Sequence, residues 1–508
     1  MAKLDWWNRG WLIAAAALVA AVPLLWPTIP PLLDLPSHMA NYRVALDLDR
    51  SPELRRYFDF EWQVIGNLGV NLLMAPIGGM LGVELGAKLI VIMIPVLTAL
   101  GFLLTARQAH GRLPPTAFAA VPLAYNYPLM FGFVNYCLAA ALAMLAFPLW
   151  LRLGEERRWR ARAVIFAGLA AAIWLAHAIG WVMLGAMCGA SEFHRRLTAD
   201  EPVARAFPGT TLACLPLLTP LLLMQLSPPG PGLSTHGWLN PIQLAKWPLM
   251  LLRDRWLILD LASAALVAGL IGAALLRFGR LRLEPKLAWP AAALFALYLA
   301  APQAISGSDF VNGRIIPYAT ALAVLAIDAR SVGTTCARWL AAASVAFLAV
   351  RLGANTISFA IYDRSYSTHL QALRHAPRGA AVLALSSVPC GSGLANWYNS
   401  RLSHLSSMIP VRTDGFVNST YGIAGLHTLR VKYDAAQEFQ ADPSGLVHVG
   451  SCARPFVRGL DEALAAIPYS AFERVWLLDI PRERWPRDPR LQALWATERA
   501  VIYRVLPS

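Results

Sequence analysis

The fold class of this chain is decided by residues 11–38, WLIAAAALVAAVPLLWPTIPPLLDLPSH. The stretch begins as an apolar run that continues to Trp26, and a carboxylate, Asp34, and an imidazole, His38, follow where the run ends. Such a run is typical of a membrane-spanning helix, and an ionisable side chain at its end is costly unless it faces water, a partner or a substrate. We therefore expect a membrane anchor followed by a candidate functional loop.

The composition places the whole chain among polytopic membrane proteins. Hydrophobic residues make up 57% of its 508 residues and charged residues only 15%, which would leave a soluble protein with too much apolar surface. The apolar runs predict an α-helical protein with about eleven spans, near residues 11–27, 84–104, 114–131, 134–151, 163–177, 179–193, 208–226, 256–276, 287–303, 314–328 and 338–359.

The distribution of Lys and Arg predicts the orientation, because cationic loops stay on the cytoplasmic side. Residues 152–162 and 277–286 hold two basic clusters on the same side as the N-terminus. We therefore expect a multi-pass protein of the cytoplasmic (inner) membrane, with its N-terminus in the cytoplasm and its C-terminal segment extracytoplasmic, or periplasmic. A cleavable secretory signal is the alternative for the N-terminal run. The net charge of +14 is dispersed over membrane-edge loops, which favours membrane lipids as partners and not nucleic acid.

The sequence changes character near residue 360, which predicts a membrane module at 1–359 and a soluble domain at 360–508. Short β-branched or aromatic stretches in the second part predict an α/β or α+β domain, with strands at 380–386, 429–433, 474–479 and 499–506 and a helix near 460–467. Cys390 and Cys452 share this exported segment, so they are either disulfide-bonded or two free thiols. The other four cysteines are expected to pack as small hydrophobic residues.

Two further helices are expected in the first outer loop, between the first two spans. Residues 38–57 alternate apolar and charged side chains, as an amphipathic helix at the membrane interface does. Residues 68–82 are apolar but short and contain Pro76, which favours a second interfacial or re-entrant helix over a span.

Two single polar side chains interrupt later apolar runs. His177 lies in Trp174-Leu-Ala-His177-Ala-Ile-Gly-Trp181, and dividing this run into two short spans places His177 at the outer turn. A buried histidine satisfied by a neighbouring helix is the alternative. Arg314 opens the tenth span from the outer side and offers a planar fork to a phosphate, or it extends to ordinary lipid headgroups.

The membrane part of the chain resembles the GT-C superfamily of membrane glycosyltransferases. The resemblance rests on four features that share one side of the membrane and occur in this order: the acidic motif, the two loop helices, the histidine at the hairpin and the arginine at the start of a late span. The resemblance covers roughly residues 10–330. It implies transfer of a sugar from a polyprenyl-phosphate donor to a hydroxyl of a lipid, glycan or protein acceptor, on the extracytoplasmic side and with inversion.

The resemblance also implies roles for individual residues. Asp34 maps to the general base, for which a cap of the following helix is the alternative reading. Arg314, His177 and His38 map to the donor phosphate, while His38 could instead contact lipid headgroups. Many members of the superfamily use two acidic residues or a metal in the first outer loop. This chain offers only Asp34 before Asp47, which leaves open whether a divalent cation takes part.

Secondary candidates are five polar residues near the outer ends of spans. One of them, Asp260, is an intramembrane carboxylate, and such residues commonly have a function. Asp260 is also close enough in the chain to Arg253 or Arg255 to be simply an ion-pair partner. The others are Asp309, Asn126, Tyr127 and Asn135, of which the last three are also typical of an interfacial belt. Two other function classes remain as alternatives, a transporter or flippase of a lipid-linked sugar and a noncatalytic membrane scaffold.

Overall fold

The computed structural model describes residues 5–229, 232, 234–390, 394–423, 425–450 and 457–507. The chain forms two compact units, and each of them combines distant segments. The helical unit consists of Met1–Trp26, Val64–Val70 and Ile90–Ile357. The sheet unit consists of Pro27–Gln63, Asn71–Leu89 and Ser358–Ser508. The first outer loop therefore belongs with the C-terminal segment, which the sequence did not predict.

The helical unit is built from helices with short connections. They are α1 (Gly10–Val19), α2 (Val22–Leu25), most of α6 (Val83–His110), α7 (Tyr127–Phe131), α8 (Val134–Glu155), α9 (Trp159–Ala176), α10 (Ala178–Leu197), α11 (Val203–Cys214), α12 (Pro220–Leu223), α13 (Pro241–Leu249), α14 (Leu257–Leu275), α15 (Pro285–Ala300), α16 (Val311–Leu325) and most of α17 (Thr334–His369). Two short strand pairs, β2 (Thr235–His236) with β4 (Ala304–Ile305) and β3 (Arg282–Leu283) with β5 (Ile327–Asp328), connect some of them.

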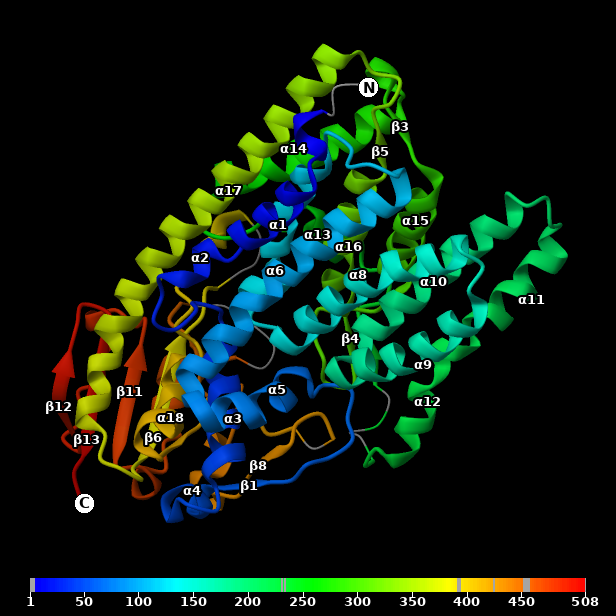
Figure 1. Cartoon of the computed structure of the whole chain (residues 1–508). Helices are drawn as coiled ribbons and strands as arrows, with labels where there is room; N and C mark the ends of the chain where they lie inside the picture. The colour runs from blue at the N-terminus through cyan, green and yellow to red at the C-terminus, as the bar shows by residue number, and fades with distance from the viewer. Residues whose placement is uncertain are drawn as a thin grey trace. The chain divides into compact units, whose positions relative to one another are not determined.

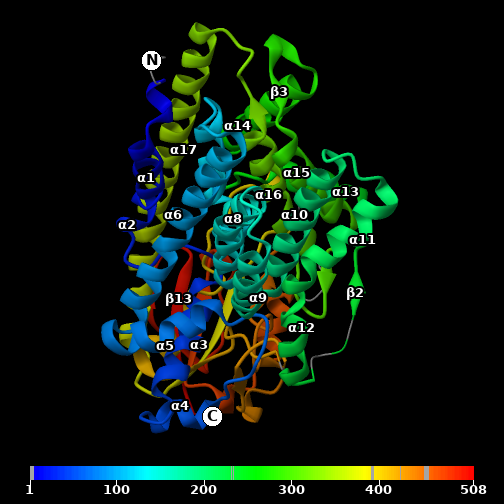
Figure 2. The same ribbon diagram turned by 45° about the vertical axis from the view of Figure 1, so that its right-hand side comes forward.

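Close helix packing in this unit depends on small residues. Helix α10 packs on α8 and α15. In turn, α15 packs on α16, and α8 packs on α9. Figure 2 shows α8, α9 and α10 side by side. A Cβ added to Gly180 would lie 2.9 Å from the backbone of Ala139, and one added to Gly101 would lie 2.9 Å from that of Met144. Glycine at these two positions therefore permits the observed contacts of α10 and α6 with α8.

Among the described residues, five helices are long and apolar enough to cross a membrane: Val83–His110, Val134–Glu155, Trp159–Ala176, Leu257–Leu275 and Thr334–His375. A sixth is formed if the bent pair Val203–Leu218 and Pro220–Leu226 acts as one span. The predicted spans near 11–27, 287–303 and 314–328 coincide with shorter apolar helices, and the one near 114–131 with a 3-10 helix, Ala117–Tyr125, followed by α7. A membrane-embedded helical architecture is thus supported, while the eleven-span topology stays a prediction.

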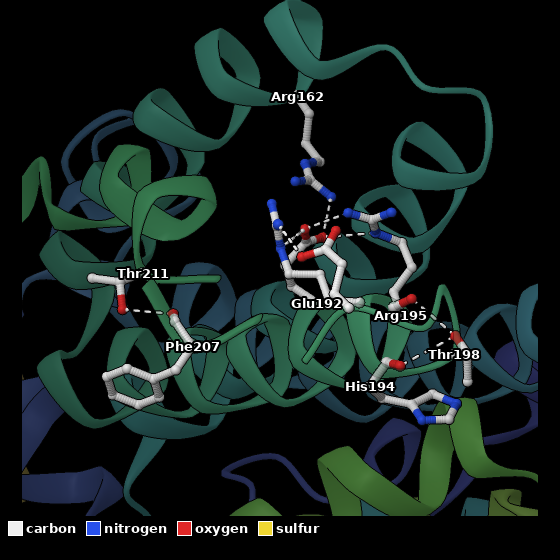
Figure 3. A network of polar contacts seen from close by, with 9 residues as sticks. Arg162, Glu192, His194, Arg195, Thr198, Phe207 and Thr211 are labelled. Carbon is white, nitrogen blue, oxygen red and sulfur yellow. Dashed lines mark hydrogen bonds and ion pairs between the residues drawn. The ribbon is translucent and has the colours of Figure 1, made fainter. Parts of the chain in front are cut away.

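A charged network joins the basic ends of α9 and α10 (Figure 3). Glu192 is buried and receives three guanidinium groups: Arg162 Nη1 at 3.1 Å, Arg195 Nη2 at 2.6 Å and Arg196 Nε at 3.2 Å. The Arg162 guanidinium also stacks on the Trp150 ring, 4.0 Å from its centroid. Because a buried carboxylate must be paired, this network explains how a strongly charged helix end lies inside the bundle.

The sheet unit contains a mixed sheet. Its strands in the described part of the chain are β6 (Ala381–Ser387), β7 (Phe416–Val417), β9 (Leu446–His448), β10 (Arg458–Gly459), β11 (Arg474–Leu478), β12 (Leu491–Ala496) and β13 (Ala500–Val505). The order is β10-β9-β6-β11-β13-β12, with β7 also paired to β6. Figure 1 shows β6, β11, β13 and β12 of this sheet. Strand β6 is parallel to β7, β9 and β11, whereas β13 is antiparallel to β11 and β12.

Four predicted strands and one predicted helix of this domain are confirmed, to within one or two residues. They are β6, β8 (Leu429–Val431), β11, β13 and α19 (Leu460–Ala465). Six of the seven residues of β6 are buried, which explains the continuous apolar run of a strand covered on both faces. Strand β8 lies outside the main sheet and pairs antiparallel with β1 (Phe58–Phe60).

The first outer loop completes the core of the sheet unit. It forms α3 (Leu35–Asp47) and α4 (Pro52–Tyr57), and Val44, Leu54 and Tyr57 are buried in the same cluster as strand residues of β6, β11 and β13. The apolar side chains predicted to lie in the membrane interface at 38–57 therefore face a protein core instead. Next comes α5 (Gly69–Leu81), the predicted second loop helix, in which Asn71 donates from Nδ2 to Asn41 Oδ1 of α3 at 2.8 Å.

Candidate functional site

Asp34 lies at the N-terminal boundary of α3 and is buried, with 4% of its surface exposed. Its side chain makes no capping hydrogen bond to the helix. Pro36 stands in the first turn and lacks an N–H, which leaves fewer backbone donors to cap. The alternative reading of Asp34 as a helix cap is therefore wrong, and the carboxylate is directed to other partners.

His404 is the side chain that links Asp34 to the rest of the unit. Its Nε2 lies 3.5 Å from Asp34 Oδ1 and 3.3 Å from the hydroxyl of Tyr421. Its Nδ1 lies 3.3 Å from the carbonyl oxygen of Ser419 and 3.8 Å from Asp442 Oδ1. One buried imidazole therefore bridges two carboxylates and a phenol, all in the sheet unit.

The loop that carries Tyr421 is fixed by hydroxyl groups. It follows β7, where the carboxyl end of a parallel strand commonly presents functional residues. Ser419 Oγ forms hydrogen bonds with Ser406 Oγ at 2.8 Å and Ser407 Oγ at 2.7 Å. The backbone N–H of Tyr421 donates to Ser37 Oγ of α3 at 3.2 Å. The segments around residues 34, 404 and 421 are thus held together by a buried polar network.

Two more histidines surround Tyr421. The ring centroids of His38 and His427 lie 5.9 Å and 5.5 Å from that of Tyr421. Burial, reinforced by His427 and His404, lowers the pKa of His38 from 6.5 to about 3, and burial lowers the pKa of His427 to about 4. Burial also raises the pKa of Asp442, against the opposing effect of His404. The unit therefore favours uncharged imidazoles at positions 38 and 427.

These shifts predict that the sheet unit loses stability in mild acid. Because the folded pKa values of His38 and His427 lie below the unfolded value of 6.5, the unfolded chain binds protons first as the pH falls. Each imidazole then lowers the free energy of unfolding by about 1.4 kcal/mol for each pH unit below 6.5, until the pH reaches the pKa of that imidazole in the folded protein. The protection factors of amides in segments 35–47 and 416–431 of the full chain, which compare exchange with that of the unfolded chain at the same pH, are expected to fall between pH 7 and pH 5.

The raised pKa of Asp442 acts in the opposite direction, because its folded form binds a proton more readily than its unfolded form. This contribution appears only as the pH falls through the folded pKa of Asp442. A His38→Gln/His427→Gln variant should show a smaller fall in protection factors than the unmodified chain. Unchanged protection factors between pH 7 and pH 5 in the unmodified chain would contradict the prediction.

Arg314 and His177 meet in the helical unit. Arg314 lies in the first turn of α16 and is buried, with its Nη1 3.2 Å from His177 Nε2 and its Nη2 donating to the Asp309 carbonyl at 2.9 Å. Its guanidinium lies over the Phe133 ring, 4.0 Å from the centroid. The two residues predicted to hold one phosphate are therefore adjacent, and the guanidinium does not extend to the surface.

His177 occupies the break between two helices, as predicted. Helix α9 ends at Ala176, α10 begins at Ala178, and His177 Nδ1 accepts the N–H of Ile179 at 3.1 Å. Both ring nitrogens thus face N–H donors, although a neutral imidazole has only one acceptor nitrogen. An anionic oxygen next to His177 and Arg314 would resolve this mismatch by accepting from both.

Asp260 is buried in an ion pair, as one of the two readings of the sequence expected. Its Oδ1 lies 2.7 Å from Nη1 of Arg351, on α17, and Arg351 also donates from Nη2 to the Leu252 carbonyl at 2.8 Å. Asp260 Oδ2 accepts the backbone N–H of Asp254 at 2.9 Å. The sequence suggested Arg253 or Arg255, which are nearer in the chain, and did not predict Arg351, which α17 brings to this carboxylate. These contacts give Asp260 a structural role.

The remaining candidates make mainly structural contacts. Asn126 caps α7 by accepting the N–H of Leu129 at 3.1 Å. Asn135 accepts the N–H of Val70 at 2.7 Å and donates to the Asn67 carbonyl at 2.8 Å, which attaches the segment at 64–70 to α8. The Tyr127 ring packs near Trp247, and the Asp309 side chain is exposed.

Metal and disulfide predictions have different outcomes. Within the described ranges, no group of three or more His, Cys, Asp and Glu side chains is arranged to hold a metal ion. The involvement of a divalent cation therefore stays an open prediction. Cys390 is disulfide-bonded, while Cys452 lies outside the described residues. Cys137, Cys188, Cys214 and Cys336 are free thiols.

Sequence reasoning missed His404, Tyr421 and Asp442. His404 lies in the serine-rich segment NSRLSHLSS at 399–407, which has no periodicity and no motif. Tyr421 follows β7, a strand of two residues that was not predicted, so no sequence signal marked this loop. Asp34 belongs to the sheet unit and Arg314 to the helical unit, so the predicted convergence of the two remains part of the proposal below.

Comparisons of this chain with protein-family models, with curated proteins and with solved structures returned no match.

Proposed function

We propose that the protein is a membrane glycosyltransferase of GT-C type that moves a sugar from a polyprenyl-phosphate donor to an acceptor hydroxyl on the extracytoplasmic side. The observation that carries the proposal is the buried carboxylate of Asp34, which is not used as a cap and whose Oδ1 lies 3.5 Å from Nε2 of His404. A buried carboxylate that does not stabilise its own helix is a candidate for proton transfer.

The proposed reaction needs one base. The acceptor oxygen attacks the anomeric carbon, the bond from that carbon to the phosphate oxygen breaks, and the polyprenyl phosphate leaves. Asp34 takes the proton of the acceptor hydroxyl, and the configuration at the anomeric carbon inverts. Because phosphate is already a good leaving group, no second carboxylic acid is required, in contrast to ordinary glycosidases. His404 acts as a positioning residue that orients the Asp34 carboxylate.

Arg314 and His177 are proposed to bind the departing phosphate. A guanidinium presents a planar pair of donors that matches a phosphate, and a buried site strengthens the interaction with developing negative charge. The two N–H donors that face the ring of His177 support this assignment, since a phosphate oxygen relieves their competition.

The proposal is tested with the purified full chain and a radiolabelled polyprenyl-phosphate sugar. Formation of a new glycosidic bond in an extract that contains candidate acceptors supports transferase activity. Movement of the labelled lipid across liposomes without a new glycosidic bond would instead favour the flippase. Neither transfer nor movement, with binding of a soluble partner to the sheet unit, would favour the scaffold.

Arg314→Gln is expected to lower kcat/KM for the lipid-linked donor about 100-fold, because a charged donor to the leaving phosphate is lost. Arg314→Lys should recover part of this loss, since it restores the charge but not the fork. The measurement is initial transfer rate against donor concentration in detergent.

The control for this pair is the backbone of Arg314. Its carbonyl accepts a hydrogen bond from the Tyr136 hydroxyl, and both substitutions leave that contact intact. Equal kcat/KM for the Gln variant and the unmodified chain would contradict a role of Arg314 in phosphate binding.

A further inference from the structure

A cleft of about 900 Å³ lies in the helical unit, at the ends of helices predicted to face the cytoplasm. It is separate from the Arg314 and His177 pair, and its lining mixes charged and apolar side chains. These come from the C-terminal halves of α6 and α8 and from connections near residues 284–286 and 330. Its size is in the range of small-molecule sites.

Four basic side chains line the cleft: Arg107, Arg152, Lys286 and Arg330. Two of them are neutralised, Lys286 by Glu155 at 2.6 Å and Arg330 by Glu284 and Asp328, each at 2.8 Å. Arg152 pairs at 2.7 Å with Glu156, in a surface contact that water screens. Arg107 is exposed, and within the described part of the chain it has no acidic side chain in ion-pair distance. Arg107 therefore presents a guanidinium that no carboxylate of the described residues neutralises, and Arg152, in its screened pair, lines the same cleft.

The floor of the cleft is apolar. Leu145, Pro148 and Leu149 line it, and they lie one to two helical turns before Arg152 on α8. On α6, Leu104 lies one turn before Arg107. Cationic groups at the mouth and an apolar surface deeper along the same helices match an amphiphile that has an anionic head and an acyl chain.

We propose that this cleft binds one anionic phospholipid, with the phosphate at Arg107 and Arg152 and part of an acyl chain along the apolar face of α6 and α8. A soluble phosphate compound would use the rim but leave the apolar floor empty. The site is independent of the proposed glycosyl transfer, because none of its lining residues belongs to the Asp34 or Arg314 clusters.

Native mass spectrometry of the full chain in detergent, titrated with phosphatidylglycerol or phosphatidylcholine, tests the proposal. Phosphatidylglycerol is expected to bind about tenfold more tightly than phosphatidylcholine. Arg107→Gln/Arg152→Gln is expected to remove this preference. Both side chains are exposed, so the double variant should fold, which its thermal unfolding checks.

The matched control is Arg112→Gln/Arg160→Gln, which removes the same charge from exposed positions outside the cleft and should keep the preference. Equal affinity for the two lipids would overturn the proposal, as would equal loss of the preference in both double variants. Displacement of phosphatidylglycerol by glycerol phosphate at equal concentration would also overturn it, in favour of a soluble phosphate ligand.

Discussion

Asp34→Asn is expected to lower sugar transfer from a polyprenyl-phosphate donor by about 10²- to 10⁴-fold, because an amide cannot accept the proton of the acceptor hydroxyl. The substitution keeps the size of the side chain and an oxygen that can face His404 Nε2, which lies 3.5 Å from Asp34 Oδ1. Since Asp34 makes no capping hydrogen bond, α3 should form as before. The measurement is the rate of labelled product formation at saturating donor and acceptor.

Two variants separate a catalytic effect from a structural one. Asp49→Asn removes a carboxylate from an exposed position of the same loop and should transfer at the rate of the unmodified chain. His404→Gln should lower the rate less than Asp34→Asn and should change the pH profile of kcat, because the imidazole orients the carboxylate without touching substrate. Full transfer by a normally inserted Asp34→Asn variant would exclude Asp34 as the base.

Local sequence patterns predicted the elements of the sheet unit well. The apolar run of β6 and the aromatic and β-branched residues of β11 and β13 mark buried strands because each strand carries its own signal. Membership of a unit is a long-range property that no local pattern contains. The amphipathic pattern of 38–57 correctly indicated helix but not its partner, since Val44 and Leu54 could face either lipid or a protein core.

The candidate site was predicted in part for the same reason. Three of the site residues could be recognised in the sequence: Asp34, His177 and Arg314. Each is a polar residue next to an apolar run, where placing an ionisable group near the membrane costs free energy unless the group has a partner or a function. His404 lies in a polar segment, where a histidine side chain has no desolvation cost that would mark it as unusual. Only the packing of loops from residues 34, 404 and 421 reveals its contact with Asp34.

Arg351→Met is expected to lower the free energy of unfolding by about 3–5 kcal/mol, because it removes a buried guanidinium that pairs with the buried carboxylate of Asp260. Both side chains of this pair are almost fully buried, with 1% and 0% of their surfaces exposed. Asp260→Leu should cost a comparable amount, since it leaves the guanidinium of Arg351 unneutralised. The measurement is chemical unfolding of each variant in the same mild detergent.

The double variant Asp260→Leu/Arg351→Met distinguishes pairing from simple loss of packing. Replacing both members of a buried pair with apolar residues is often nearly neutral, so the double variant should be more stable than either single variant. The free energy of unfolding of the double variant should stay about 1–3 kcal/mol below that of the unmodified chain, because the N–H of Asp254 loses its acceptor, Asp260 Oδ2. If the double variant instead loses as much stability as the two single variants together, Asp260 and Arg351 act independently and the ion pair does not hold α14 to α17.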